Sequence, residues 1–424
     1  MTYTIQDAIA HLLCRLNEVL QRLEKSTSSV EDPNKPLADL LDSMAMVEWL
    51  AVVAEDHRIS LAAIEECLGR RIGTIAEMAA QLHSAGWVPN STNNPRRAPS
   101  LVAPVPPASV RPCWLVRTSV QLPDSIESAA SINAKLQRPA GWLERHAGIH
   151  QRRIWADQDS LAAASQAGSA CLEQARWPTE KVGALLVTSE APPLLTGMAA
   201  NLNHRLRLEP HAPAIEIGGA CTGFLAAFRI AQGLLDQVGS VLVIAVEAAT
   251  RYLHVQPGPA GEDAALFGDG AAACLLCRDP QGVDAVPVGP VVLGADGSSA
   301  GLLQAELLQN GVEFRMRRFE LASRAVEAMA RSVRELAGRH GLSISDLDAI
   351  VVHGGNGRLP GLLARKLGLP PERIWSATPQ TGNLGSASLP VAWAAHPLPK
   401  GRSIWTAVGA GLMWGAVMLG NPDA

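Results

Sequence analysis

Apolar residues in the first part of the chain recur at helical spacing. Between Ile5 and Leu23 they stand mostly three or four positions apart, as on one face of a helix. A second helix is predicted to begin at Asp42-Ser43, and a last one to run from Thr74 to Leu82, with a short segment between them. Residues 1–88 are therefore predicted to form a small all-α helix bundle.

This periodicity stops between residues 89 and 112. The 24 residues of this stretch hold seven prolines and a group of Ser, Thr and Asn residues. A proline-rich chain without apolar periodicity is extended and semi-rigid. The stretch is predicted to be a linker.

Beyond the linker, short apolar runs typical of buried strands alternate with helical patterns. The strands are predicted at 115–120, 182–188, 214–218, 241–246, 271–277, 349–352 and 373–376, and the helices at 161–176, 223–238, 318–339 and 362–367. Such alternation favours α/β layers with mostly parallel sheets. The uncharged stretch 403–422 contains four glycines, which favours two buried strands around a glycine turn over a membrane helix.

Composition narrows the class of protein. The net charge of −4 argues against binding to nucleic acid by bulk charge, and 47% apolar residues suffice for large cores. The seven cysteines are scattered and no early apolar run suggests a signal peptide, so a reducing, cytoplasmic location is expected. The Cys274-x-x-Cys277 pair lies in an apolar strand without a second pair, and no metal site is predicted.

A serine stands where the second predicted helix begins. Taken alone, Ser43 is a helix N-cap. The run Asp42-Ser43-Met44 and the acidic helix after it, over residues 37–82, resemble an acyl carrier protein, although Leu40-Leu41 stand where many carriers have a glycine. The resemblance implies that Ser43 carries 4'-phosphopantetheine, attached by a phosphopantetheinyl transferase, and that the acidic helix docks onto basic partner enzymes.

A cysteine follows a predicted buried strand and a tight turn. In the run from Ala214 to Phe224, Cys221 stands at the predicted start of a helix, among small residues. The helix dipole and free N–H groups there favour the thiolate, which is the nucleophilic form. A lone buried cysteine is more often inert packing, so the assignment depends on other motifs.

Two later motifs supply a histidine and an asparagine. His353 follows a predicted strand in His353-Gly-Gly-Asn356, and Asn383 lies in a glycine-rich turn that begins at Gly382. Each is weak alone, because a lone histidine is usually structural and Gly-Asn is a common turn. The ordered set Cys221, His353 and Asn383 is much more specific.

Residues 113 to 424 resemble β-ketoacyl-ACP synthase III and its relatives in the thiolase superfamily. The family motifs Ala-Cys-Ala-Gly-Phe, Phe-Gly-Asp-Gly-Ala, His-Gln-Ala-Asn, Gly-Asn-Thr-Ser-Ala-Ala-Ser and a glycine-rich end before Trp-Gly have counterparts, in this order, at 220–224, 267–271, 353–356, 382–388 and 409–415. The resemblance implies a five-layer αβαβα fold and a homodimer. Its two similar halves are expected at 113–290, with the cysteine, and at 291–424, with the histidine and asparagine.

The resemblance also implies a role for each residue. Cys221 accepts an acyl group from a thioester, and the backbone N–H groups of Cys221 and Ala410 form the oxyanion hole. His353 and Asn383 donate hydrogen bonds to the enolate formed when a malonyl thioester loses CO2. Asn356 is expected to shape the loop behind the histidine.

The family's CoA-binding residues are only partly present. Trp142 matches the tryptophan that pairs with the CoA adenine, but His146 replaces the first arginine. Arg358, Arg365 and Lys366 match the basic patch that receives carrier proteins, although a solvated helix face would look the same. Carrier-bound thioesters, more than free CoA, are the expected substrates, from the chain's own carrier domain or from that of a partner chain.

Several other functions remain open. An acyltransferase of the same fold would move the acyl group to an alcohol, amine or carrier thiol, and a non-catalytic chain would only bind another ketosynthase. Glu190 lies one residue from where HMG-CoA synthase-like relatives place a general-base glutamate, whereas the Asn383 motif belongs to the synthase III pattern. The leading hypothesis is a carrier–ketosynthase fusion for decarboxylative Claisen condensation in fatty-acid-like or polyketide biosynthesis.

Overall fold

The computed structural model describes two compact units of the chain. The described residues are 4–22, 30–41, 43–57, 64, 73–86, 112–194, 196–308, 311–396 and 401–420. One unit comprises Met1–Pro106 with Arg318–Arg324, and the other Pro107–Arg317 with Ala325–Ala424. The predicted linker, apart from Pro112, and all but Ile64 of the segment at 61–68 lie outside the described residues.

Helices form the described part of the N-terminal unit. They are α1 (Ile5–Arg22), α2 (Leu37–Leu40), α3 (Ser43–His57) and α5 (Ile75–Ser84). Their inner faces bury Leu16, Trp49 and Ile75, and the indole of Trp49 donates a hydrogen bond to the carbonyl of Leu12 at 3.2 Å. Thr74 begins α5 with a capping box to Glu77. The three helices predicted from periodicity are confirmed.

A six-stranded sheet forms the first half of the second unit. Its strands are β1 (Trp114–Gln121), β4 (Ala184–Thr188), β5 (Ala214–Ile217), β6 (Ser240–Ala248), β7 (Asp269–Cys277) and β8 (Val286–Pro287). They are ordered β5-β4-β6-β7-β1-β8. The first three are parallel to one another, whereas β7 and β1 pair antiparallel with their neighbours.

A five-stranded sheet forms the second half. Its strands are β9 (Val292–Ala295), β12 (Ala349–Val352), β13 (Ile374–Trp375), β14 (Ser403–Gly409) and β15 (Met413–Leu419). They are ordered β13-β12-β14-β15-β9, with the first three parallel and the last two antiparallel. The two sheets therefore repeat one pattern of three parallel and two antiparallel strands.

The prediction of mostly parallel sheets is wrong, because both sheets are mixed. Only three residues separate β14 from β15. So short a connection joins antiparallel strands, whereas a parallel pair needs a longer crossover. Within the uncharged stretch 403–422, residues 403–419 form this pair of buried strands, as predicted. No helix among the described residues is long and apolar enough to cross a membrane.

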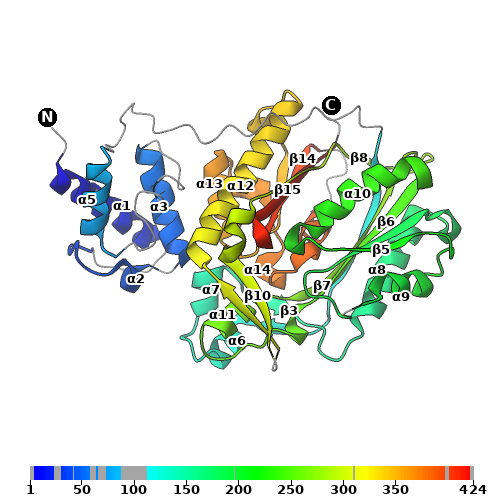
Figure 1. The fold of residues 1–424 in the computed structure, drawn as a ribbon, viewed down its shortest axis with the longest axis horizontal. Coiled ribbons are helices and arrows are strands. Elements are labelled where there is room, and N and C mark those ends of the chain that lie inside the picture. The colour runs from blue at the N-terminus through cyan, green and yellow to red at the C-terminus, as the bar shows by residue number, and fades with distance from the viewer. Residues whose placement is uncertain are drawn as a thin grey trace. The chain divides into compact units, whose positions relative to one another are not determined.

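Helices lie between the sheets and on their outer faces (Figure 1). Between them lie α10 (Gly223–Val238) and α15 (Ser388–Ala394), which share one core with both sheets. Phe224, Phe228 and Trp393 of these helices surround the ring of Trp405 in β14. Helices α8 (Ser160–Ala175) and α9 (Met198–Arg205) cover the outer face of the first sheet, and α12 (Arg318–Arg339) and α13 (Leu359–Leu367) lie beyond the second.

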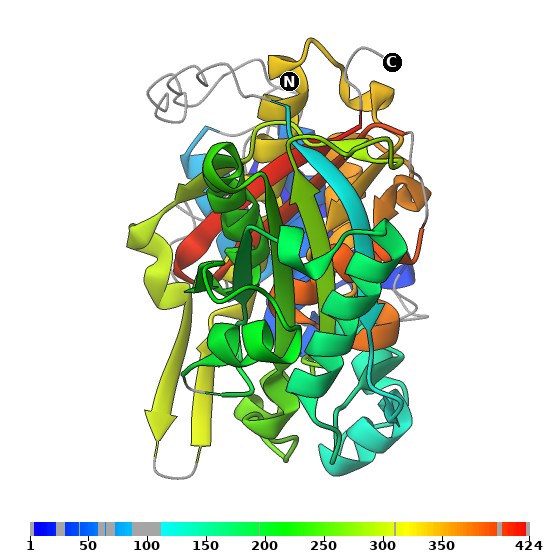
Figure 2. The same ribbon diagram turned by 90° about the vertical axis from the view of Figure 1, so that its right-hand side faces the viewer.

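Smaller elements surround these layers. They are β2 (Ile126–Ser128), α6 (Ala129–Lys135), α7 (Trp142–Ala147), β3 (Gln151–Arg153), α11 (Pro259–Ala264), β10 (Leu303–Leu308), β11 (Gly311–Met316) and α14 (Thr378–Thr381). The β10–β11 hairpin extends away from the layers as a two-stranded ribbon (Figure 2). None of these elements was predicted from the sequence, because their apolar runs are too short to show a period.

Candidate active site

Cys221 lies on a tight turn between a strand and a helix, as predicted. The 3-10 turn η2 (Ala220–Thr222) follows β5 and leads directly into α10. Two successive positive φ angles, 122° at Gly219 and 48° at Ala220, turn the chain sharply just before the cysteine. Left-handed backbone at a residue with a Cβ is strained, and such strain concentrates at functional sites. Cys221 itself is only 5% exposed.

The thiol of Cys221 is not activated in the way the sequence predicted. Burial, and then the neighbouring Glu190, raise the pKa of Cys221 well above its ordinary value. A helix N-terminus stabilises an anion by about 2 kcal/mol at most, whereas burial can shift a pKa by several units. Burial therefore opposes the stabilisation of the thiolate that the helix N-terminus was expected to provide, and the net shift favours the neutral thiol.

The thiol donates a hydrogen bond to a carboxylate that the sequence analysis left outside the catalytic set. The distance from Cys221 Sγ to Glu190 Oε2 is 2.9 Å. Glu190 follows the carboxyl end of β4, and Cys221 follows the carboxyl end of the adjacent parallel strand β5. Parallel neighbours end at the same edge of a sheet, which explains how residues separated by 31 positions meet.

A second carboxylate, Glu247 of β6, fixes the backbone at Glu190. It accepts hydrogen bonds from the N–H of Glu190 at 2.9 Å, from the N–H of Ala191 and from the hydroxyl of Ser189. The N–H and hydroxyl of Ser386 donate to it from the other half of the fold. Burial, and then the charge of Glu247, raise the pKa of Glu190 to about 7. Glu190 is therefore poised to titrate near neutral pH.

His353 and Asn383 come together at one point of the second half. A Cβ built on Gly355 would lie 3.3 Å from His353 Nε2 and 3.8 Å from Asn383 Nδ2. The other ring nitrogen, Nδ1, lies 3.0 Å from the hydroxyl of Ser388, and Asn383 Oδ1 accepts the N–H of Gly385 at 2.8 Å. The two remaining nitrogens therefore face the same small space as possible donors.

Burial also decides the charge of the histidine. It lowers the pKa of His353 to about 4, although a hydrogen bond to the backbone of Gly385 opposes this shift. A buried imidazole without a facing carboxylate is more stable neutral. At neutral pH, His353 can thus act as a hydrogen-bond donor without a net charge.

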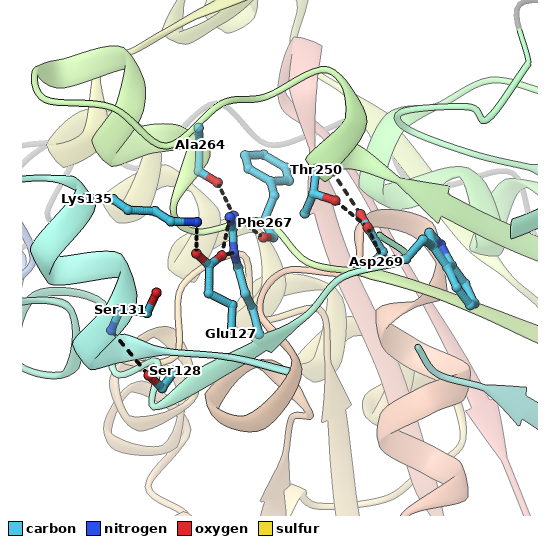
Figure 3. A network of polar contacts seen from close by, with 10 residues as sticks. Glu127, Ser128, Ser131, Lys135, Thr250, Ala264, Phe267 and Asp269 are labelled. Atoms are coloured by element: carbon cyan, nitrogen blue, oxygen red, sulfur yellow. Dashed lines mark hydrogen bonds and ion pairs between the residues drawn. The ribbon is translucent and has the colours of Figure 1, made fainter. Parts of the chain in front are cut away.

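The position of Asn383 depends on the loop around Phe267. The backbone of Asn383 bonds to Leu266 at 2.7 Å and to Gly268 at 3.0 Å, across the two halves. The guanidinium of Arg152 donates to the carbonyl of Phe267 at 3.0 Å. That same guanidinium is held by the buried carboxylate of Glu127, and Figure 3 shows this network.

The buried Asp269 anchors the other end of the same loop. Its carboxylate accepts the N–H groups of Trp155 and Thr250, both at 2.9 Å, and the Thr250 hydroxyl (Figure 3). The Phe267 to Ala271 motif thus helps to position Asn383, while its acidic side chain, Asp269, accepts hydrogen bonds from backbone and hydroxyl donors.

The loop after β14 approaches the cysteine from the second sheet. A Cβ built on Gly409 would lie 3.2 Å from the backbone nitrogen of Cys221. The next residue, Ala410, begins the 3-10 turn η8 (Ala410–Leu412). The backbone segment that includes Ala410 is therefore close to Cys221, as an oxyanion hole made of the two N–H groups requires.

Comparison with known proteins places the chain in one family. Residues 215–297 match the family model of 3-oxoacyl-[acyl-carrier-protein (ACP)] synthase III, and residues 337–420 match that of its C-terminal part. A 3-oxopimeloyl-[acyl-carrier-protein] synthase of Rhodothermus marinus is 32% identical over an alignment of 345 residues, and the match covers 76% of this chain and 98% of that protein. The chain belongs to the β-ketoacyl-ACP synthase III family.

Other relatives agree. The β-ketoacyl-[acyl-carrier-protein] synthase III of Pseudomonas aeruginosa is 33% identical over 325 residues, covering 71% of this chain and 94% of that protein. A crystal structure of the enzyme from that species matches with a TM-score of 0.67 at 29% identity, covering 73% of this chain and 98% of the other. The priming β-ketosynthase of the R1128 polyketide pathway matches with a TM-score of 0.66 at 25% identity, covering 76% of this chain and all of the other. The chain is thus an acyltransferase with a thiolase-like fold of two mixed sheets.

Two more of the predicted site residues, Trp142 and Asn356, make contacts within the synthase unit. Trp142 begins α7, and its ring stacks on that of His146 with the centroids 4.7 Å apart. The guanidinium of Arg138 lies 5.5 Å from the centre of the same ring. Asn356 accepts the N–H of Arg358 with its side-chain oxygen at 2.9 Å, which closes the turn after His353.

The predicted basic patch lies on and beside α13. Lys366 forms an ion pair with Glu327 of α12 at 3.0 Å, and Arg358 donates to the carbonyl of Arg145 at 3.2 Å. Arg365 lies beside Lys366 in the last turn of the helix. Lys366 and Arg358 thus have intramolecular contacts, and docking of a carrier protein remains a prediction.

Proposed function

We propose that this synthase III joins an acyl group on Cys221 to a malonyl-type thioester by decarboxylative Claisen condensation, in fatty-acid-like or polyketide biosynthesis. The observation that carries the proposal is the convergence of two neutral donors, His353 Nε2 and Asn383 Nδ2, on the space beside Gly355. An enolate oxygen placed there would accept a hydrogen bond from each. Donors aimed at developing charge are the largest single source of catalysis in such sites.

The two half-reactions use different residues of the site. In the first, the sulfur of Cys221 attacks the acyl thioester, and the backbone N–H groups of Cys221 and Ala410 stabilise the oxyanion. In the second, loss of CO2 leaves the enolate, whose carbon attacks the acyl group on Cys221. In the tautomer in which the Ser388 hydroxyl donates to Nδ1 of His353, Nε2 carries the ring proton and donates a hydrogen bond to the enolate oxygen.

The N-terminal unit is proposed to be an acyl carrier. Three observations support this proposal: Ser43 is the first residue of α3, the unit buries its own apolar core, and residues 1–88 carry 13 acidic and 7 basic side chains. A phosphopantetheine on Ser43 would supply a thiol on a long arm. Tethering such a thiol to the synthase raises its local concentration to about the millimolar range.

The acyl and malonyl groups are proposed to arrive mainly on carriers, from this chain or from the partner chain of a homodimer. The stacking of His146 on Trp142 supports this preference, because it occupies one face of the ring that the family resemblance assigned to CoA. The cytoplasm remains the expected compartment, and the six described cysteines are free thiols.

The test is to feed an acyl thioester together with malonyl-loaded carrier protein. We expect CO2 release in proportion to acyl consumption, and a β-ketoacyl product on the carrier. C221A should abolish product formation. If the acyl group moved to a carrier thiol, an alcohol or an amine without CO2 release, the chain would instead be an acyltransferase of the same fold, and condensation would be refuted.

A further inference from the structure

The contact between Cys221 and Glu190 is the feature of the site that the proposed condensation leaves without a function. The thiol donates to Oε2 at 2.9 Å, and no other hydrogen bond of the Glu190 carboxylate is recorded among the described residues. Glu190 also keeps part of its surface accessible, while Cys221 is nearly covered. A buried thiol and a partly accessible carboxylate thus share one proton.

The chemistry of acylation requires that proton to move. A neutral thiol is a poor nucleophile, and the pKa of Cys221 lies well above its ordinary value. A base must therefore take the proton as sulfur attacks. The hydrogen bond that the thiol makes in the described structure goes to Glu190, whereas Nδ1 of His353 lies at the hydroxyl of Ser388.

We propose that Glu190 is a further catalytic residue, the general base and then the general acid in the acylation of Cys221. The inference rests on the proposed function, since it concerns the first half-reaction of that chemistry. As Sγ bonds to the carbonyl carbon of the thioester, the thiol proton passes to Oε2 of Glu190. When the carbon–sulfur bond to the leaving group breaks, the departing thiolate takes that proton and the carboxylate is restored.

The surroundings of Glu190 suit this task. Glu247 faces it from β6 and Cys221 from η2. Burial, and then the charge of Glu247, raise the pKa of Glu190 to about 7, although the hydrogen bond from Cys221 opposes this shift. From the second half, His353 forms a hydrogen bond with the backbone of Gly385, the residue beside Glu190. A general base is most effective when its pKa is close to the working pH.

The turn at Gly385 is shaped around the same carboxylate. A Cβ at this position would lie 2.8 Å from Oε2 of Glu190 and 2.7 Å from Oε1 of Glu247. The family motif quoted above has a serine here, so this chain differs from that motif at Gly385. The absence of a side chain at 385 gives Glu190 the space to reach Cys221.

The test follows acylation of Cys221 in the full chain by rapid-quench intact mass spectrometry, with the acetyl thioester of N-acetylcysteamine as the probe. In the wild type, we expect the rate to rise tenfold per pH unit below about 7 and to level above it. E190Q should lose this inflection and acylate about 10²–10⁴-fold more slowly at neutral pH. E190D keeps a carboxylate and should retain the inflection at a reduced rate.

The matched control is Glu216→Gln, the same change at an exposed carboxylate of β5. It should leave both the rate and its pH profile unchanged. Circular dichroism and CO2 release from malonyl thioester, which depends on His353 and Asn383, report whether each variant is folded.

Three results would overturn the inference. The first is acylation of E190Q at the wild-type rate, the second is faster acylation because a negative neighbour of the thiol is gone, and the third is normal acylation with a failure only in condensation. The proposed function fails separately: normal acylation of the wild type without CO2 release would refute condensation and leave the assignment of Glu190 intact. If wild-type Cys221 stayed unmodified, both would fall.

Discussion

His353 and Glu190 show opposite pKa shifts with one common cause. Burial disfavours the charged form of each group, so it lowers the pKa of the imidazole to about 4 and raises that of the carboxyl to about 7. Across the physiological pH range His353 keeps a constant charge, while Glu190 changes its own. We therefore expect the two half-reactions to differ in their dependence on pH.

The first prediction concerns His353. Because its pKa is about 4, the decarboxylation of a malonyl thioester should stay constant from pH 8 down to about pH 5. H353A should slow CO2 release by about 10²–10³-fold, as removal of one oxyanion donor does, and leave acylation of Cys221 unchanged. Isotope-labelled malonyl thioester measures the release.

His204→Ala, at an exposed histidine of α9, is the matched control and should have no effect. Loss of wild-type decarboxylation with a midpoint near pH 6.5 would contradict a neutral, buried His353.

The second prediction concerns stability. The pKa of Glu190 rises from 4.5 to about 7 on folding, so its contribution to stability is fully present below pH 4.5 and is lost as the pH rises through 7. E190Q should therefore raise the free energy of unfolding at pH 8 by at most about 3 kcal/mol, with a higher Tm, and change both little at pH 5. Calorimetry of both proteins at the two pH values measures this, and an equal gain at both would disprove it.

At the level of elements, the site depends on where strands end. Glu190 and Cys221 follow neighbouring parallel strands, β4 and β5, whereas His353 and Asn383 come from the second half. The tight turns at η2 and at Gly385 let backbone approach backbone there. Side chains larger than the native ones in these turns should therefore damage the site without unfolding the layers.

The third prediction tests this at Gly385. G385A places a Cβ within 2.8 Å of two carboxylates, at a residue whose φ is +48°. We expect a loss of about 1–3 kcal/mol of stability, as for other overpacked positions, together with slower acylation of Cys221. Thermal unfolding and the acylation assay measure the two effects.

Gly361 of α13 provides the control, because a Cβ there meets nothing within 4 Å. G361A should leave acylation unchanged and raise stability by up to about 1 kcal/mol, since alanine is the better helix former. Equal behaviour of the two variants would show that Gly385 is not shaped around the carboxylates.

For the whole molecule, charge is divided unevenly along the chain. Residues 1–88 carry −6, from 13 acidic and 7 basic side chains, and the remaining residues carry +2, from 27 and 29, which sum to the net charge of −4. An acidic carrier and a slightly basic synthase would attract each other, and salt would weaken that attraction.

The fourth prediction tests the carrier. When the full chain is co-expressed with a phosphopantetheinyl transferase, its mass should increase by one phosphopantetheine. S43A should prevent this increase and leave acylation of Cys221 by a small thioester unaffected, because that reaction needs only the synthase. Intact-protein mass spectrometry measures both effects.

Ser84→Ala, at a serine of α5 in the same unit, is the control and should be modified like the wild type. Modification of S43A would place the attachment elsewhere, and an unmodified wild type would argue against a carrier domain.

The sequence by itself determined the main elements and the ordered set of Cys221, His353 and Asn383. Strands such as β12 and helices such as α10 and α12 begin and end where the apolar period predicts. This is possible because periodicity and turn residues act over a few neighbouring positions. The same local signals placed Cys221 on a turn before a helix.

Only the tertiary structure decided the direction of the strands, the charge states of the site residues and which side chain contacts Cys221. Pairing within each sheet depends on distant segments, so the mixed sheets were not predicted. The contact of Glu190 with Cys221 spans 31 positions, and both pKa shifts arise from burial that no local pattern records. Glu190, which the sequence analysis left outside the catalytic set, thus contacts the nucleophile, because adjacent parallel strands end at one edge of a sheet.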